Sequence, residues 1–425
     1  MTEDFLHYIW KFQRFNPHSL KCVNGEQLEV INAGMHNFDS GPDFFNSRLR
    51  IDNTEWAGNV EVHLRSSDWY KHGHQDDKVY DKVILHLVWE DDQPVKRANG
   101  DLIPTLELKG RVNRVVLEKF EALNKSKDWI PCENDFTNLE EIYVSQQLNR
   151  MMVERLEEKS SRLDRLLKLH TNDWEEVFYQ LLCRYFGFKV NATPFELLST
   201  TLPFSLLRKH QQSLMQLEAL LFGQAGFLNE NFKGDYPLKL QKEYRYLAKK
   251  YQLKSMDVSL WKFMRMRPSN FPTIRLAQLA ALINKYQKFF SPLVEKSQVE
   301  ELTSFFKVEA SDYWESHYRF DVPAARRQTK KMGKQSIEIL LINVVSPLLF
   351  NYGQVKGDGK FKDRALELLE KLPAEKNSIT KKWNNLGAPL ESAFHSQALI
   401  QLKNKHCDFK KCLTCILGNA ILKKE

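Results

Sequence analysis

Residues 41–64 constrain the fold more than any other stretch of this chain, because their pattern predicts a β-hairpin. Aromatic and branched residues are frequent at positions 44–51, and turn-forming residues follow at positions 52–54. In the return strand, apolar residues alternate strictly with Glu61 and His63. Glu61 and His63 are therefore predicted to point to the same face of the second strand.

The register of this hairpin determines where Asp43 lies. A tight turn at positions 52–54 pairs residues whose numbers add up to about 105–107. Asp43 then lies opposite residues 62–64, close to both Glu61 and His63. An even sum places Asp43 on their face of the sheet, and an odd sum requires a β-bulge to bring it there. Three side chains that can bind a metal are thus predicted to converge at the open end of the hairpin.

Two carboxyl groups close together on a sheet favour a bound cation, because their charges repel each other without one. Mg²⁺ and Mn²⁺ accept carboxylate and water oxygens, and such a metal can activate water and stabilise a phosphoryl-transfer transition state. His63 could accept a proton from that water, bind the metal or contact a phosphate. The alternative interpretation is a solvated strand face, with Asp43 capping the turn after Gly41 and Pro42.

Pro42-Asp43, seventeen intervening residues and Glu61-Val62-His63 together resemble the motif of the PD-(D/E)XK nuclease superfamily. His63 stands at the position that is usually lysine. The resemblance implies a restriction-endonuclease-like sheet on which Asp43 and Glu61 bind Mg²⁺ or Mn²⁺ and residue 63 helps to place the attacking water. It also implies an acid on an upstream helix, and Glu3 is the candidate, with His7 one turn further along.

The chain as a whole is similar to a bacterial family catalogued as domain of unknown function 2851. The matching segments are FLHYIWKF, GPDF, GNVEVHLRSSDWYKHGH, YDKVILHLV and the cysteine cluster near the C-terminus. This resemblance gives a family without a function. The residues therefore predict a divalent-metal-dependent nuclease, a hydrolase of phosphodiester bonds. The alternative is a non-catalytic nucleic-acid-binding or scaffold protein with an inactive nuclease-like domain.

Residues 66–77 follow the hairpin and contain Trp69, His72 and His74. We expect them to form a flexible polar loop along the same site, with these three side chains as candidate substrate contacts. Trp69 could stack on a splayed base or form a hydrophobic lid. Two histidines at this spacing could also bind a transition metal, which leaves a metalloenzyme acting on small substrates as a third class. His86, in the next apolar strand, is expected to be a hydrogen-bonded core residue.

The hydrophobic period changes along the chain and predicts a mixed α+β protein. Residues 1–14 have the pattern of a helix, residues 27–110 that of four or five short strands, and from about residue 138 the period is 3.6. We expect three parts. These are a small α/β nuclease-like domain at 1–130, a large α-helical domain at 131–354, and a basic helical segment with the cysteine cluster at 355–425.

Composition and charge narrow the class of protein. The chain of 425 residues is 42% hydrophobic, with a mean hydropathy of −0.49, which is ordinary for a soluble protein. The most apolar run, 337–350, is too short to cross a bilayer, and the N-terminus lacks a basic-then-apolar signal pattern. We therefore expect a cytoplasmic protein without a membrane partner.

Positive charge is concentrated late in the chain. The net charge is +8, and residues 355–425 hold 14 Lys or Arg against 8 Asp or Glu. Arg326 and Arg327 begin a compact basic run that could contact a nucleic-acid backbone. The alternative interpretation is a solvated helical face. Nucleic acid is thus the predicted partner, and the sequence indicates no particular protein partner.

Three of the six cysteines form the motif His406-Cys407-x₄-Cys412-x₂-Cys415. Thiolates at this spacing bind zinc or an iron–sulfur cluster, and the surrounding lysines favour the thiolate form. The spacing resembles plant-type ferredoxins, and some PD-(D/E)XK nucleases hold a cluster with one earlier cysteine, here Cys22. Zinc with His406, or with a fourth ligand from elsewhere, is the simpler prediction, and buried thiols are the alternative. Cys132 and Cys183 are expected to be core residues.

Overall fold

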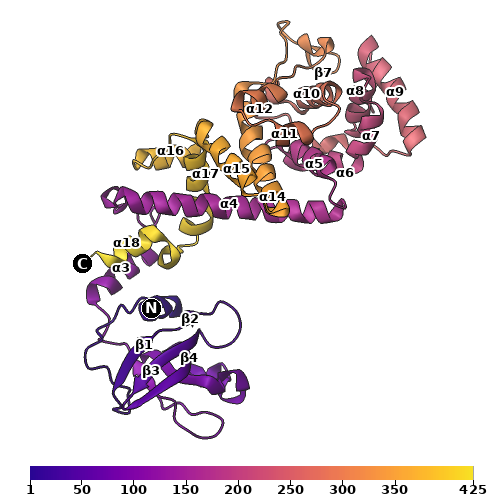
Figure 1. Ribbon diagram of the computed structural model, residues 1–425. Helices are drawn as coiled ribbons and strands as arrows, with labels where there is room; N and C mark the ends of the chain where they lie inside the picture. Colours follow the sequence, from indigo (N-terminus) through magenta and orange to yellow (C-terminus); the bar gives the residue numbers. More distant parts are fainter. Residues whose placement is uncertain (425) are drawn as a thin grey trace. The chain divides into compact units, whose positions relative to one another are not determined.

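The computed structural model describes residues 1–424 and shows a mixed α+β protein with two compact units (Figure 1). The first unit combines the two ends of the described chain, residues 1–147 and 402–424, and contains a mixed β-sheet. The second unit, residues 148–401, is mainly helical. The predicted change from a strand-rich to a helical sequence is confirmed. The predicted segment 355–425 is divided between the two units.

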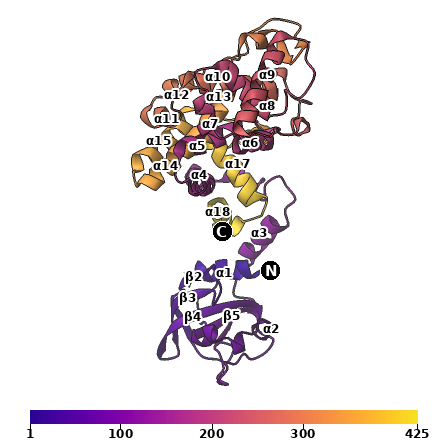
Figure 2. The ribbon, with the colours of Figure 1, turned by 90° about the vertical axis from the view of Figure 1, so that its right-hand side faces the viewer.

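The sheet of the first unit has six strands in the described chain, in the order β1-β3-β4-β5-β6 with β2 paired to β3. The pairs among β1 to β4 are antiparallel, whereas β5 runs parallel to β4 and β6 parallel to β5 (Figure 2). The strands are β1 (Leu28–Asn32), β2 (Met35–His36), β3 (Phe44–Ile51), β4 (Thr54–Arg65), β5 (Val83–Glu90) and β6 (Thr105–Glu107).

The predicted hairpin is formed by β3 and β4, and it contains a β-bulge. Ser47 pairs with Gly58, but Phe44 pairs with Val60, so one extra residue is inserted in β3. Within this irregularity Asn46 has a left-handed backbone with φ of 57°. In the outer part of the hairpin, the residue numbers of each pair add up to an odd total. Beyond the bulge, where Phe44 pairs with Val60, the total is even. This shift brings Asp43, which directly precedes β3, to the position opposite the inner end of β4.

Helix α1 (Glu3–Lys11) lies against β4 (Figure 2). Its first turn is capped by Thr2, whose side chain accepts a hydrogen bond from the N–H of Phe5. The Trp10 indole donates to the carbonyl oxygen of Ala33 at 3.0 Å. Phe5 stacks on Phe120 of α3 (Arg114–Lys125), with ring centroids 4.3 Å apart. These contacts fix the side chains of α1 beside the open end of the hairpin.

The expected flexible loop at 66–77 is ordered as two short helical segments, α2 (Asp68–Lys71) and the 3₁₀ turn η1 (His74–Asp76). The expectation of an irregular loop was wrong, because the buried side chain of Trp69 fixes this segment against the core. Its side chain is buried in a core cluster with Val83, Val95 and Ile103. A further 3₁₀ helix, η2 (Lys78–Lys82), leads into β5.

Helices form most of the second unit, as the 3.6-residue period predicts (Figure 1). Two of these helices, α7 and α8, are separated by a short break, and Ser213 caps the second. Helix α4 begins in the first unit. The helices are α4 (Glu141–Leu169), α5 (Trp174–Phe186), α6 (Ala192–Thr201), α7 (Phe204–Lys209), α8 (Leu214–Gln224), α9 (Asp235–Tyr251), α10 (Pro272–Lys285), α11 (Ser291–Glu295), α12 (Val299–Phe305), α13 (Lys334–Leu340), α14 (Ser346–Lys356), α15 (Gly359–Lys371), α16 (Ser378–Asn385) and α17 (Ala393–Gln401).

The remaining elements are short. The second unit contains a two-stranded ribbon of β7 (His317–Arg319) and β8 (Val322–Pro323). The C-terminal part of the first unit consists of the π-helix η8 (Leu402–Cys407), the 3₁₀ turn η9 (Cys412–Thr414) and helix α18 (Ile416–Lys423). The 3₁₀ helices elsewhere are η3 (Phe136–Asn138), η4 (Val258–Leu260), η5 (Pro268–Asn270) and η6 (Asp312–Glu315).

The apolar run at 337–350 belongs to a longer helix than the sequence indicates. Helix α13, the π-helix η7 (Leu341–Val345) and α14 are continuous over 334–356, and these 23 residues are long and apolar enough to cross a membrane. The length argument from the sequence was therefore wrong. However, 72% of the apolar stretch within this helix is buried inside the protein, as is common for a core helix. The helix is therefore weak evidence for a membrane span.

The bulge generates a prediction about residue 46. A β-branched side chain is strained in the left-handed conformation that Asn46 adopts, whereas glycine accepts it. We expect Asn46→Val to destabilise the protein by about 1–3 kcal/mol. Asn46→Gly, at the same position, is expected to cost much less. Urea denaturation of both variants checks this, and equal destabilisation of the two would contradict it.

Candidate active site

Two hydrogen bonds join Asp43 to Glu61 and Val62 at the bulged end of the hairpin. Oδ2 of Asp43 accepts from the N–H of Val62 at 2.9 Å, and the N–H of Asp43 donates to Oε2 of Glu61 at 3.2 Å. The Asp43 side chain is 24% exposed, whereas that of Glu61 is 6% exposed. His63 is buried as well. The alternative interpretation of a solvated strand face was therefore wrong.

The surroundings of Glu61 favour its neutral carboxylic acid form. Burial, followed by the nearby charge of Asp43, raises the pKa of Glu61 to about 9, although the hydrogen bond from the Asp43 amide acts in the opposite direction. Without a cation, Glu61 is thus protonated at neutral pH. A metal ion bound between the two acids would displace this proton.

Helix α1 places Glu3 and His7 beside the two acids. Nε2 of His7 lies 3.3 Å from Oδ2 of Asp43. Burial alone would lower the pKa of His7, but the contact with the Asp43 carboxylate and its charge outweigh it and raise the pKa overall. Burial also raises the pKa of Glu3, and the charges of His72 and Asp43 act on it. The helical acid implied by the resemblance therefore borders the same site.

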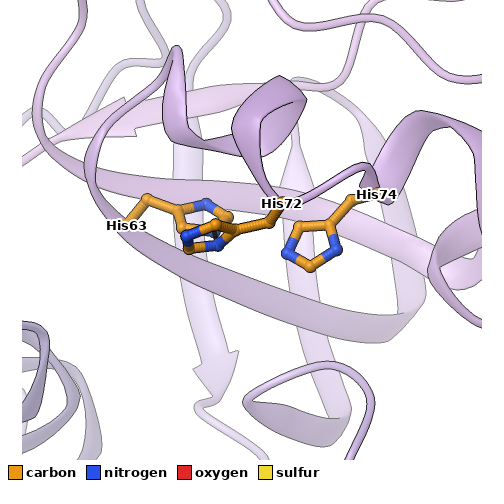
Figure 3. Close-up of side chains that lie close together, drawn as sticks. All are labelled: His63, His72 and His74. Carbon is orange, nitrogen blue, oxygen red and sulfur yellow. Dashed lines mark hydrogen bonds between the residues drawn. The ribbon is translucent and has the colours of Figure 1, made fainter.

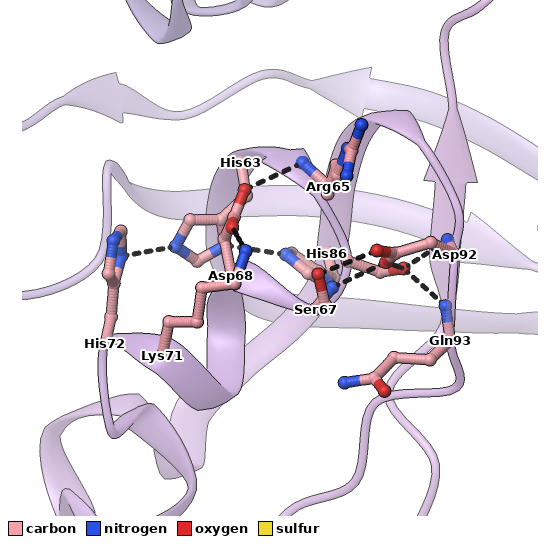
Figure 4. A network of polar contacts seen from close by, with 10 residues as sticks. His63, Arg65, Ser67, Asp68, Lys71, His72, His86, Asp92 and Gln93 are labelled. Carbon is pink, nitrogen blue, oxygen red and sulfur yellow. Dashed lines mark hydrogen bonds and ion pairs between the residues drawn. The ribbon is translucent and has the colours of Figure 1, made fainter.

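A chain of hydrogen-bonded imidazoles runs from His72 through His63 to His86 (Figure 4). Nδ1 of His63 lies 2.8 Å from Nε2 of His86, and Nε2 of His63 lies 3.0 Å from Nδ1 of His72. Burial, followed by the charges of the neighbouring histidines, lowers the pKa of His63 to about 2, and burial lowers that of His86 to about 3. Both rings are neutral at physiological pH. Nδ1 of His86 has no hydrogen-bond partner among residues 1–424, so the chain ends there.

His74 connects this chain back to the acid pair. Its Nε2 lies 3.2 Å from Oε1 of Glu61, and the same oxygen lies 3.7 Å from Nε2 of His63. The ring of His74 stacks on Tyr80, with centroids 3.8 Å apart. Burial lowers the pKa of His74, which favours the neutral ring. One oxygen of Glu61 therefore faces two neutral imidazoles.

Three of these rings converge in the manner of a metal site (Figure 3). His63, His72 and His74 each offer one ring nitrogen, and these three atoms lie within 4.8 Å of one another. Neutral imidazole is the form that binds metals. If His63 donates its Nδ1–H to Nε2 of His86, its Nε2 lone pair points towards His72 and could bind a metal in place of that contact. In this tautomer His86 orients a ligand without touching the metal.

A polar network holds α2, and with it His72, against the sheet (Figure 4). The Ser66 hydroxyl lies 3.0 Å from Oδ1 of Asp92, and the N–H of Ser67 donates to the same oxygen at 2.8 Å. The N–H of Arg65 donates to Oδ2 of Asp68 at 3.0 Å. His72 directly follows α2, so its position is fixed by these bonds.

The other predicted contact residues lie in two different environments. Trp69 is 1% exposed, and its ring packs 5.4 Å from that of His86. This is the hydrophobic-lid position rather than a surface for stacking on a base. Arg326 and Arg327 are exposed in the second unit, where Nε of Arg327 pairs with Oε2 of Glu315 at 2.7 Å. They form part of a different compact unit from the acid pair.

The cysteine motif and the acid pair lie on different secondary-structure elements. Cys407, Cys412 and Cys415 lie along η8, η9 and the start of α18, in the C-terminal part of the first unit. His406, the predicted zinc ligand beside them, is buried.

Sequence reasoning missed the role of His86 and the contact of Tyr80. His86 was correctly expected to be buried and hydrogen-bonded, but its partner is His63 of the site. Its position follows from the parallel register of β4 and β5, in which Glu61 lies beside His86. The only signal in the sequence is a single histidine within an otherwise apolar strand, and that signal does not name the partner.

The fold and this site define a mixed α+β protein with a partly buried centre of carboxyl groups and histidines. The chain belongs to the family described as "Protein of unknown function (DUF2851)", whose model matches residues 3–378. This match confirms the family that segments such as GPDF indicate. No curated protein and no solved structure matches the chain. The likeness to PD-(D/E)XK nucleases stays a prediction.

The shifted pKa values predict how the stability of the metal-free protein depends on pH. Folding favours protonated Glu61, so its contribution is lost as pH rises from about 4.5 towards 9. Folding favours neutral His63 and His86, so their contributions are lost as pH falls below about 6.5. For this site, we expect the melting temperature in excess chelator to be highest near pH 6.5.

A matched pair of variants isolates the alkaline part of this prediction. Glu61→Gln should weaken the loss of stability between pH 6.5 and 9, because its side chain cannot ionise. Glu55→Gln changes an exposed acid on the same strand and should leave the profile unchanged. A wild-type melting temperature that rises steadily from pH 6.5 to 9 would contradict the assignment.

Proposed function

We propose that this protein is a divalent-metal-dependent nuclease that hydrolyses phosphodiester bonds. The observation that carries the proposal is the meeting of Asp43 and Glu61 at the bulged end of the β3–β4 hairpin. A parallel strand, β5, follows on the far side of β4, and α1 lies against β4 with Glu3 and His7 beside the acids. This arrangement is consistent with the restriction-endonuclease-like sheet that the sequence motif implies.

The donor atoms favour a metal that accepts both oxygen and nitrogen. Asp43 and Glu61 offer carboxylate oxygens, and His63, His72 and His74 offer imidazole nitrogens close by. Mg²⁺ prefers oxygen ligands in strict octahedral geometry, whereas Mn²⁺ binds carboxylates and also accepts imidazole. We therefore choose Mn²⁺ as the first metal to test. When bound, such a metal lowers the pKa of water and stabilises negative charge on phosphoryl oxygens.

The surroundings of the histidines suggest different roles for His63 and His7. A ring whose pKa is lowered to about 2 is a weak proton acceptor, so His63 suits a neutral ligand better than a general base. His7, whose pKa is raised by Asp43, carries positive charge more readily and is placed to contact a phosphate. Asp43 is the more exposed acid and borders the entrance to the site.

Charge supports nucleic acid as the substrate. The chain has a net charge of +8, and Arg326 and Arg327 lie exposed in the second unit. Such groups can neutralise backbone phosphates. The proposal includes a cytoplasmic protein without a membrane partner, which the burial of most of helix 334–356 supports.

One observation favours a second function. His63 stands where the superfamily motif has lysine, and its low pKa removes the positive charge that lysine would bring. A protein that kept this fold without the chemistry would bind nucleic acid without cleaving it. The same assay distinguishes the two.

The test is a Mn²⁺-dependent cleavage assay on single-stranded and duplex DNA and RNA. We expect the wild type to cleave at least one substrate. Glu61→Gln should reduce the rate at least about 100-fold, because it removes a charged metal ligand. Glu55→Gln should retain the wild-type rate, since Glu55 lies exposed on the same strand and pairs with Arg48.

Both failures have a defined meaning. Cleavage that survives Glu61→Gln would locate the activity elsewhere, and the proposal would be wrong. No cleavage with any substrate, together with salt-dependent nucleic-acid binding, would establish the non-catalytic function instead.

A further inference from the structure

The first unit contains a second group of metal-binding side chains that the proposed function does not use. It lies in the C-terminal part of the unit, where the chain turns back on itself after Cys407. The N–H of Lys411 donates to the carbonyl oxygen of His406 at 3.0 Å, and Lys410 adopts a left-handed conformation. This reversal brings Cys407 back towards Cys412.

Cys412 and Cys415 stand at the two ends of one tight turn. The N–H of Cys415 donates to the carbonyl oxygen of Cys412 at 3.3 Å. Helix α18 begins directly afterwards and packs so closely that a Cβ at Gly418 would lie 2.1 Å from the same carbonyl oxygen. The absence of a side chain at residue 418 therefore fixes the turn against the helix, and both thiols have defined positions.

The segment at 119–147 packs against the segment that carries the three C-terminal cysteines. Helix α18 lies against α3 (Figure 1). The Lys410 ammonium donates to the carbonyl oxygen of Asn124 at 2.6 Å, and the N–H of Ile416 donates to Oε1 of Gln147 at 2.9 Å. The Lys403 ammonium lies 5.4 Å from the centroid of the Trp129 ring. Pro131 and Asp135 line one pocket together with Ile421 of α18, so the C-terminal segment lies beside the turn that contains Cys132.

The four thiols are close enough to influence one another. Burial raises the pKa of Cys132, and so do the charges of Cys415 and Cys412. Burial also raises the pKa of Cys407, with further contributions from Cys415, Cys132 and Cys412. Cys132 and Cys415 are buried, and the other two are partly buried. Four thiolates could not coexist here without a cation to neutralise them.

We infer that Cys132, Cys407, Cys412 and Cys415 form a four-thiolate metal centre that fastens the C-terminal segment to the 119–147 segment. Cys132 is the fourth ligand, and His406 is not required. The shared ligand chemistry suits a zinc ion or an iron–sulfur cluster. With zinc, the ion takes four sulfur ligands and four thiol protons pass to the solvent. The centre closes a loop that includes most of the chain, which is the topology in which a crosslink restricts the unfolded state most.

The test measures metal in the full-length protein purified without oxygen. We expect about one zinc ion or about four iron atoms per chain, and broad visible absorption only in the iron case. Cys132→Ser should lose most of this metal. Two matched variants should keep it. They are Cys22→Ser, a buried cysteine of the same unit whose electrostatic neighbours are acids, and His406→Asn.

A second measurement does not depend on how well the variants fold. Wild-type protein stripped of metal and loaded with Co²⁺ should show sulfur-to-cobalt charge-transfer absorption with the intensity of four thiolates. An intensity of three thiolates, or full metal retention in Cys132→Ser, would overturn the role of Cys132. No metal in the wild type, even after reconstitution with zinc or with ferrous iron and sulfide, would overturn the centre. Neither result bears on cleavage by the acid pair.

Discussion

The hydrogen bond from the N–H of Val62 to the carboxylate of Asp43 is the contact on which the site depends. It exists because one extra residue in β3 shifts the hairpin register and turns the chain before β3 towards the inner end of β4. Asp43 then lies close enough to raise the pKa of Glu61, and His7 of α1 lies beside Asp43. A carboxyl group placed in this way acts as both a structural acceptor and a candidate ligand, so fold and site are not separable here.

The first unit contains two clusters of polar side chains whose charged forms are costly to bury close together unless a cation neutralises them. At the open end of the hairpin these are two acids with three imidazoles, and near the C-terminus they are four thiols. Burying such groups has a cost in free energy that ordinary core residues avoid. The same physical reasoning therefore underlies both of the cation sites that we propose, with oxygen and nitrogen ligands in one and sulfur ligands in the other.

Local patterns were sufficient for much of the first unit. The turn at 52–54 and the alternation around Glu61 predicted the hairpin, and this is confirmed. They left two registers open, and the structure has the odd one with a bulge. Trp69 shows the limit of such reasoning. Polar neighbours suggested a mobile loop, but the indole is buried among side chains from the strand and loops that follow, and this orders the segment. Helix 334–356 likewise extends beyond its apolar run, because polar residues at its ends continue the helical backbone.

The sequence by itself determined the mixed α+β class, the hairpin with its acids, the helix that carries Glu3 and His7, and the spacing of three cysteines. These depend on residues near one another in the chain, where turn chemistry and periodicity act directly. Only the tertiary structure decided that His86 contacts His63 and that the turn containing Cys132 lies beside helix α18. Both depend on segments brought together by packing, since a crossover between parallel strands does not fix their register and the intervening chain does not fix where the two ends meet.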